Sequence, residues 1–189
     1  MRASPRKVTE KATMFQLRQV AMAADVPVET LKTYIGRELL TGFEGGGGPG
    51  QRREFSFNTV MECCTAIAAI KCGAAQAEAF SAAMLFAHAG KGPTYWVGES
   101  PDTTRTRMFS APFDRSLGRT LLALADGNAA LFLVADGKDV WETVKSKFPD
   151  AKAALIIDLN IVFDRTCEKL DLDPKEVFPS SKEAMAKYV

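Results

Sequence analysis

The chain has 189 residues, a formal net charge of +1 and 47% hydrophobic residues, so it is long enough to bury one large core or two smaller ones. No apolar run approaches the length of a membrane span, and residues 1–13 lack the apolar stretch of a signal peptide. We therefore expect a cytoplasmic protein whose four cysteines are reduced.

The charge is unevenly distributed along the chain. The first 53 residues carry nine Lys or Arg and five Asp or Glu, whereas the remainder carries 15 Lys or Arg and 18 Asp or Glu. A basic first part joined to a mildly acidic remainder is typical of a nucleic-acid-binding module attached to another unit. Residues 1–13 are polar and basic without apolar periodicity, which predicts a flexible basic arm. The arm is either a frayed terminus or a segment that follows a groove of DNA.

The first ordered segment is predicted to be a pair of short helices. An apolar face at helical spacing begins the pair, and it consists of Leu17, Val20, Ala21 and Ala24. Pro27 then breaks the pattern, because it cannot donate a backbone hydrogen bond and disfavours helical angles at the residue before it.

The second helix begins at about Pro27 or Val28, and we expect it to bury Leu31, Tyr34 and Ile35. Its other face is polar and basic: Glu29, Thr30, Lys32, Thr33 and Arg37. Two helices at this spacing, the second with short polar and basic side chains near its start, have the geometry of a helix-turn-helix.

A glycine-rich hairpin is expected next, with arms at 41–43 and 55–57. The tip at 44–50 is too rich in glycine to hold one shape unaided. Arg52 and Arg53 follow it on the returning arm, where they could hold phosphates; a flexible loop with solvated arginines is the alternative.

This segment resembles the winged-helix DNA-binding domain of the MerR superfamily of regulators. The matching positions are Leu17, Val20 and Ala21; Val26; Thr30, Leu31, Lys32, Thr33 and Tyr34; Leu39 and Leu40; and Arg53, Glu54, Phe55 and Ser56. The sequence departs from the family pattern at four positions. Lys32 stands where the family has Arg, and Thr33 stands where it has an aromatic residue. Asp25 replaces a glycine of the turn, and Glu38 replaces the glycine after the second helix. The resemblance covers under half of the chain; it implies a winged helix-turn-helix at 14–90 that binds duplex DNA.

Two helices should follow the hairpin. The first, capped by Asn58 and ending at Gly73, is expected to bury Val60, Met61, Cys64, Ile67, Ala68 and Cys72. The second spans 74–89, with Phe80, Met84 and Ala87 along one side and His88 at its end. Cys63 and Cys64 are adjacent, which does not suit tetrahedral metal ligation, so we interpret the cysteines as packed core thiols and expect no metal.

Residues 91–93 mark a predicted domain junction. Beyond it the patterns predict strands at 95–99 and 104–110, a helix at 117–125, a strand at 130–135, a helix at 139–148, a strand at 153–159 and a helix at 161–170. The tail from Asp171 is polar. Residues 91–189 therefore form a small α/β domain for dimerisation or ligand sensing, and the fold class of the chain is α+β.

No catalytic or cofactor motif occurs in this second half. Asp136, Asp158 and Asp164 lie near the ends of apolar segments, where turns and helix caps explain them better than catalysis does. Three aromatic residues, Trp96, Phe132 and Trp141, are expected in the core, although they could line a pocket. Arg105 and Arg107 could bind an anion, but a solvated sheet face is the simpler interpretation. We expect neither an enzyme nor a cofactor.

These observations predict a sequence-specific transcriptional regulator that binds double-stranded DNA as a homodimer, with a possible small-molecule effector. The residues expected at the DNA are Arg18, Thr30, Lys32, Thr33, Tyr34, Arg37, Arg52 and Arg53. One alternative is a protein that binds DNA without regulating transcription, as phage excisionases and terminase small subunits do. Another is a small-molecule-binding α/β protein with an N-terminal interaction module.

Overall fold

The computed structural model describes residues 14–40, 42–44, 52–87, 118–135 and 137–177. Its elements are β1 (Phe15–Gln16), α1 (Leu17–Ala24), α2 (Val28–Gly36), β2 (Phe43–Glu44), β3 (Glu54–Phe55), α3 (Phe57–Lys71), α4 (Gln76–Ala87), β4 (Arg119–Ala125), β5 (Asn128–Val134), α5 (Val140–Lys147), β6 (Leu155–Asp158), α6 (Leu159–Leu170) and α7 (Pro174–Val177). The helices accompany two three-stranded antiparallel sheets, so the described chain is mixed α and β, consistent with the expected α+β class. The basic arm, most of the hairpin tip, His88, the junction at 91–93 and the strands at 95–110 lie outside the described residues.

The predicted pair of short helices is confirmed. α2 begins directly after Pro27 and buries Leu31, Tyr34 and Ile35. Between the helices, Asp25 adopts a left-handed conformation with φ 57°, and its backbone N–H donates to the carbonyl oxygens of Ala21 and Met22. A non-glycine residue therefore closes α1 in a conformation that glycine adopts more readily.

The predicted hairpin is present in part: its described arms are the two-residue strands β2 and β3, in a small sheet of order β1-β3-β2, whereas Phe57 of the predicted second arm belongs to α3. The central residue of this sheet, Phe55, is fully buried and pairs with Phe15 on one side and Phe43 on the other. The cap of the following helix was wrongly placed at Asn58: α3 begins at Phe57, and the hydroxyl oxygen of Ser56 accepts the Thr59 N–H at 3.2 Å. Ser56 has the extended backbone that a capping residue needs, so the strand passes directly into the helix.

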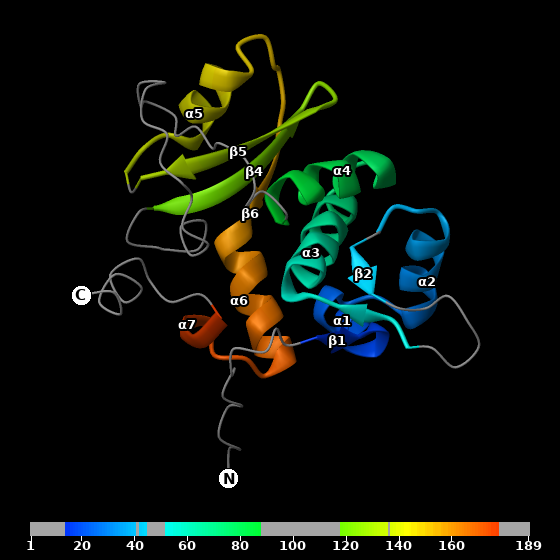
Figure 1. Ribbon diagram of the computed structural model, residues 1–189. Helices are drawn as coiled ribbons and strands as arrows, with labels where there is room; N and C mark the ends of the chain where they lie inside the picture. Colours follow the sequence, from blue (N-terminus) through cyan, green and yellow to red (C-terminus); the bar gives the residue numbers. More distant parts are fainter. Residues whose placement is uncertain (1–13, 41, 45–51, 88–117, 136, 178–189) are drawn as a thin grey trace.

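α3 and α4 pack against each other near the centre of Figure 1, beside and above β2. Gly73 has φ 102°, which confirms the expected left-handed turn after α3. The expected burial of Cys72 is wrong, because this residue is exposed at the end of α3, and Met84 is 48% exposed on α4. Phe86 is buried instead, since the inward side of α4 passes through Phe80 and Phe86.

The predicted helix at 117–125 is wrong, because β4 occupies Arg119–Ala125. Leu122 and Leu124 face the core that contains the N-terminal helices, whereas Leu121 and Ala123 pack in a second cluster with Val144 of α5. A strand covered on both faces has a continuous apolar run instead of an alternating one. Such a run cannot be distinguished from a buried helix by its periodicity.

The strand predicted at 130–135 and the strand and helix predicted near the C-terminus are confirmed as β5, β6 and α6. β4 is the central strand of the second sheet and pairs antiparallel with both β5 and β6. Asp139 caps α5 by accepting the N–H groups of Trp141 and Glu142. Trp141 was expected to point inward, but it is 40% exposed. The tail also contains the short helix α7.

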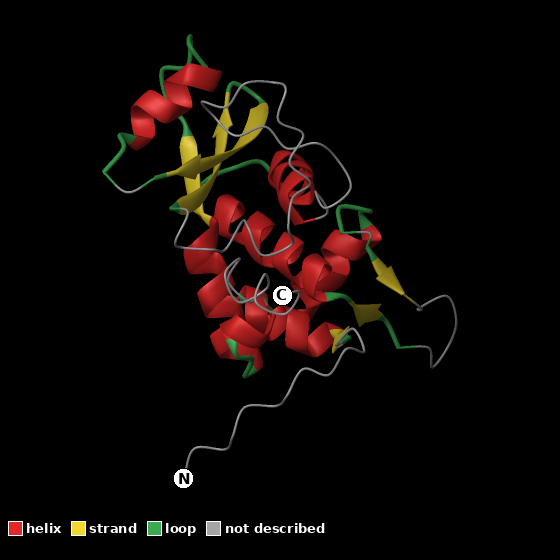
Figure 2. Ribbon diagram, turned by 60° about the vertical axis from the view of Figure 1, so that its left-hand side comes forward, coloured by secondary structure: helices red, strands yellow, loops and turns green. Residues whose placement is uncertain are grey.

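The main hydrophobic core is shared by the N-terminal helices and the second sheet. Leu159, Phe163 and Cys167 of α6 belong to the same buried cluster as Val20 of α1 and Ile67 of α3. The rings of Phe57 and Phe163 meet edge to face, with centroids 6.0 Å apart. In Figures 1 and 2, α6 runs from the second sheet into the cluster of helices, so the two expected domains share one core.

Candidate nucleic-acid interface

The outward face of α2 carries a short polar stripe. The side chains of Glu29 and Lys32 are 79% and 51% exposed, and the Lys32 Nζ donates to the Glu29 Oε1 at 2.8 Å. The hydroxyl of Thr33 donates to the backbone carbonyl oxygen of Glu29 at 3.0 Å. Residues three and four positions apart lie on the same side of a helix. Glu29, Lys32 and Thr33 therefore form one contiguous surface, which we call the α2 stripe.

The other residues expected on this side are placed as follows. Thr30 is half-buried beside the stripe, and Arg18 is exposed on α1. Arg37 is exposed at the end of α2, where its Nη1 donates to the Oε1 of Gln76 at 3.0 Å. Arg37 therefore also ties the end of α2 to the beginning of α4.

The placement of Tyr34 differs from the expectation that it contacts DNA. Its side chain is only 6% exposed, and its ring packs against Phe80 of α4 with centroids 5.1 Å apart. Helical periodicity already placed Tyr34 on the inward face with Leu31. We therefore leave Tyr34 out of the candidate interface.

The two arginines of the hairpin have different surroundings. Arg52 is exposed, whereas Arg53 is half-buried with its guanidinium 5.4 Å from the centroid of the Phe43 ring. Phe43 packs in turn against Phe55, at a centroid distance of 5.5 Å. Stacking on an aromatic face limits the conformations that an arginine can adopt. The Nε of Arg53 is buried and has no hydrogen-bond partner within the described residues.

Asp25, in the turn between α1 and α2, is held by lysines from two other helices. Its carboxylate lies 3.1 Å from the Nζ of Lys71 on α3 and 3.7 Å from the Nζ of Lys169 on α6. The hydrogen bond from Lys71 and the charge of Lys169 lower the pKa of Asp25 below 3.8. This stabilisation is present at neutral pH and is lost as the pH falls through the lowered pKa. Because the groups are exposed, we expect its contribution to be small.

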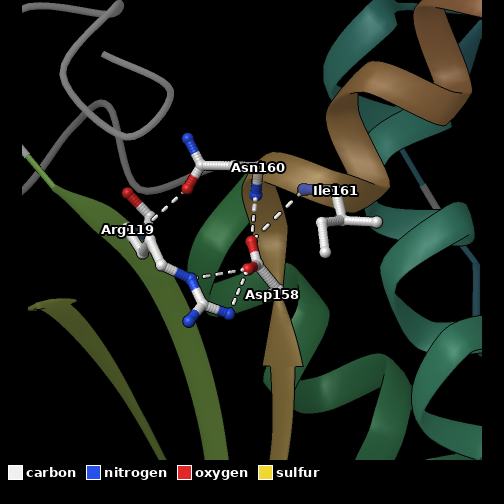
Figure 3. A network of polar contacts seen from close by, with 5 residues as sticks. Arg119, Asp158, Asn160 and Ile161 are labelled. Carbon is white, nitrogen blue, oxygen red and sulfur yellow. Dashed lines mark hydrogen bonds and ion pairs between the residues drawn. The ribbon is translucent and has the colours of Figure 1, made fainter. Parts of the chain in front are cut away.

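A polar network fixes the beginning of α6 to the second sheet (Figure 3). Asp158 caps the helix, because its Oδ1 accepts the N–H groups of Asn160 and Ile161, and this confirms the interpretation of Asp158 as a cap. Its Oδ2 accepts from the Nε and Nη2 of Arg119 at 3.0 and 2.6 Å. The Oδ1 of Asn160 accepts the N–H of Thr120 at 2.7 Å. Both oxygens of Asp158 therefore hold β4, β6 and α6 together.

Three of the four cysteines are buried, and Cys72 is exposed. Burial raises the pKa of Cys64 to about 11 and that of Cys167 to about 12, and it raises the pKa of Cys63 as well. Within the described ranges, no three His, Cys, Asp or Glu side chains gather in a way that could hold a metal ion. The three buried cysteines belong to the main hydrophobic core, which confirms that they are packed core thiols.

We predict that one thiol of the native protein reacts with a disulfide reagent at pH 8, because only Cys72 is accessible and the buried thiols remain protonated. All four thiols should react in denaturant. The coloured thiolate that the reagent releases measures the number of reactive thiols in the native and in the denatured protein. Cys72→Ser should abolish the reaction of the native protein, and fast reaction of two or more thiols would contradict this arrangement.

No described helix has both the length and the apolar character needed to cross a membrane. Searches of protein-family models and of curated proteins found no match to this chain.

Proposed function

We propose that this protein is a sequence-specific regulator of transcription that binds double-stranded DNA as a homodimer. The observation that carries the proposal is the placement of the α2 stripe and the hairpin. In Figure 1, α2 and β2 lie together at the right of the molecule, away from the second sheet. One duplex could therefore contact both without meeting the second sheet.

The physical support comes from how helices bind duplex DNA. The major groove is about 12 Å wide and admits an α-helix. α2 begins the stripe in its first turn, which is the part of a recognition helix that reaches the base edges. Arg52 and Arg53 would contact phosphates beside the groove, and Arg18 would add a contact from α1. Phosphate contacts fix the position of the protein, and α2 supplies the sequence preference.

A homodimer would bring two copies of α2 to the DNA. Two-fold symmetry then requires inverted half-sites whose spacing follows the helical repeat of the duplex. The expected binding site is therefore a pair of inverted half-sites.

Selection of bound sites from random and genomic duplex pools tests the proposal. We expect enrichment of one inverted sequence, with genomic sites near promoters. Lys32→Glu should abolish the enrichment, because it places a second negative charge on the stripe. Lys152→Glu, at an exposed position between α5 and β6, is the matched control and should leave the selected sequence unchanged. A pool that shows no enrichment with the unaltered protein would refute the proposal.

A further inference from the structure

The α2 stripe contains a feature that phosphate binding does not explain, namely the exposed carboxylate of Glu29. An isolated negative charge at a DNA-binding surface is repelled by the phosphates. Glu29 is not isolated, however, because the ammonium group of Lys32 lies 2.8 Å from its Oε1. The ion pair is neutral as a whole, and it presents a hydrogen-bond acceptor directly beside a donor.

We propose that Glu29 and Lys32 act as one unit that recognises a G·C base pair in the major groove. This inference rests on the proposed function and names the base pair that α2 would prefer. The carboxylate of Glu29 would accept the exocyclic N4–H of cytosine. The ammonium of Lys32 would donate to the O6 of guanine, and a further N–H could reach the N7 of the same base.

The spacing of the ion pair supports this assignment. In a G·C pair, the cytosine N4 and the guanine O6 are hydrogen bonded to each other across the base pair, at about 2.9 Å. The 2.8 Å between the Lys32 Nζ and the Glu29 Oε1 matches that separation. The two side chains can thus meet the two base atoms without breaking their own contact.

An A·T pair also presents a donor beside an acceptor, so the distinction depends on the neighbouring groups. In G·C, the two acceptors O6 and N7 are adjacent, and one ammonium group can serve both. In A·T, the donor N6 lies between the acceptors N7 and O4, and the methyl group of thymine stands next to O4. With the carboxylate of Glu29 at N6, the ammonium could reach N7 or O4 but not both, and at O4 it would meet the methyl group, so A·T offers it one contact where G·C offers two. The pair therefore favours G·C.

Thr33 supports this arrangement through its position on the helix. Its hydroxyl donates to the backbone carbonyl oxygen of Glu29, so its donor hydrogen is already used within α2. Hydrogen-bond donation to the base edges at the beginning of the stripe is thereby left mainly to Lys32.

Site selection with Glu29→Gln and Lys32→Met tests the inference. The unaltered protein should select sites with one fixed G·C pair in each half-site. Both variants should weaken the preference at that same pair by about tenfold or more, since one good bidentate contact supplies discrimination of that order. Glu29→Gln should also shift the preference towards A·T, because a glutamine amide pairs well with adenine. Glu142→Gln, which removes an exposed carboxylate from α5, is the control and should change nothing.

Two outcomes would overturn the inference and leave the proposed function intact. In one, the variants select the same base pairs as the unaltered protein with equal discrimination. In the other, Glu29→Gln strengthens binding to all duplexes equally, which would mean that Glu29 only repels phosphates. A failure of the unaltered protein to enrich any sequence is a different result, because it refutes the proposed function itself.

Discussion

Phe163→Ala should lower the free energy of unfolding by about 3–5 kcal/mol, the usual cost of removing a buried phenylalanine. Phe163 is 4% exposed and lies in the core that α6 shares with α1 and α3. Because that core is continuous, the loss should destabilise the helices before residue 90 as well as the second sheet. Urea denaturation followed by circular dichroism measures the change in the free energy of unfolding. Hydrogen exchange of the backbone amides of α1 and α2 shows whether these helices are destabilised as well.

The matched control is Ile161→Ala, two residues earlier on α6. Ile161 is 46% exposed, so its replacement should cost less than about 1 kcal/mol. Faster exchange in α6 and β4 of the Phe163→Ala protein, with unchanged exchange in α1 and α2, would show that the two parts unfold separately. That result would contradict a shared core.

The double substitution Arg52→Ala/Arg53→Ala should weaken binding to every duplex by roughly 100-fold or more at low salt, because each of the two charged hydrogen bonds to phosphate contributes about 1.5–3 kcal/mol. The plot of log affinity against log salt concentration should lose about two units of slope, or nearly one per phosphate contact. The selected sequence should stay the same, since phosphate contacts carry no base preference. Fluorescence anisotropy titrations over a range of salt concentrations provide the measurement.

Lys147→Ala/Lys152→Ala removes two exposed positive charges near α5 and serves as the control. This control lowers the net charge by the same amount as the Arg52→Ala/Arg53→Ala substitution. Comparison of the two variants therefore distinguishes a local phosphate contact from a general attraction to polyanions. An equal loss of slope in both double variants would refute the assignment of the hairpin arginines. Because Arg53 packs on Phe43, the thermal midpoint of the first variant must also be measured.

Much of the N-terminal fold could be predicted because its signals are local. Pro27 separates the two short helices, and the spacing of Leu31 and Ile35 identifies the buried face of α2. Gly73 ends α3 as expected. In these segments the period, the helix breaker and the capping residues all favour the same structure.

β4 was missed because its local signal is ambiguous. Asp126 and Gly127 follow its apolar run with φ of 51° and 73°, and two positive φ values in succession are those of a type I′ hairpin turn. An Asp-Gly pair between apolar segments is a hairpin signal, but the same pair can also follow the end of a helix, as the predicted helix at 117–125 requires. The apolar segment of 130–135 directly after it was the cue that favoured a hairpin.

The candidate site was only partly predictable from the sequence. Helical spacing placed Glu29, Lys32 and Thr33 together, whereas the stacking of Arg53 on Phe43 depends on the pairing of β2 with β3. The contacts of Asp25 with Lys71 and Lys169 bring together residues from three parts of the chain. No local pattern identifies such partners, because they are determined by how α3 and α6 pack on α1.

The most direct test of the central claim is a competition titration with the selected duplex, a scrambled duplex of equal length and heparin. If α2 binds base edges while the hairpin arginines hold the adjacent phosphates, the selected duplex should bind about 1,000-fold or more tightly than the scrambled one. Heparin should displace the scrambled duplex readily and the selected duplex only at much higher concentration. Equal affinity for the two duplexes at every salt concentration would contradict the account.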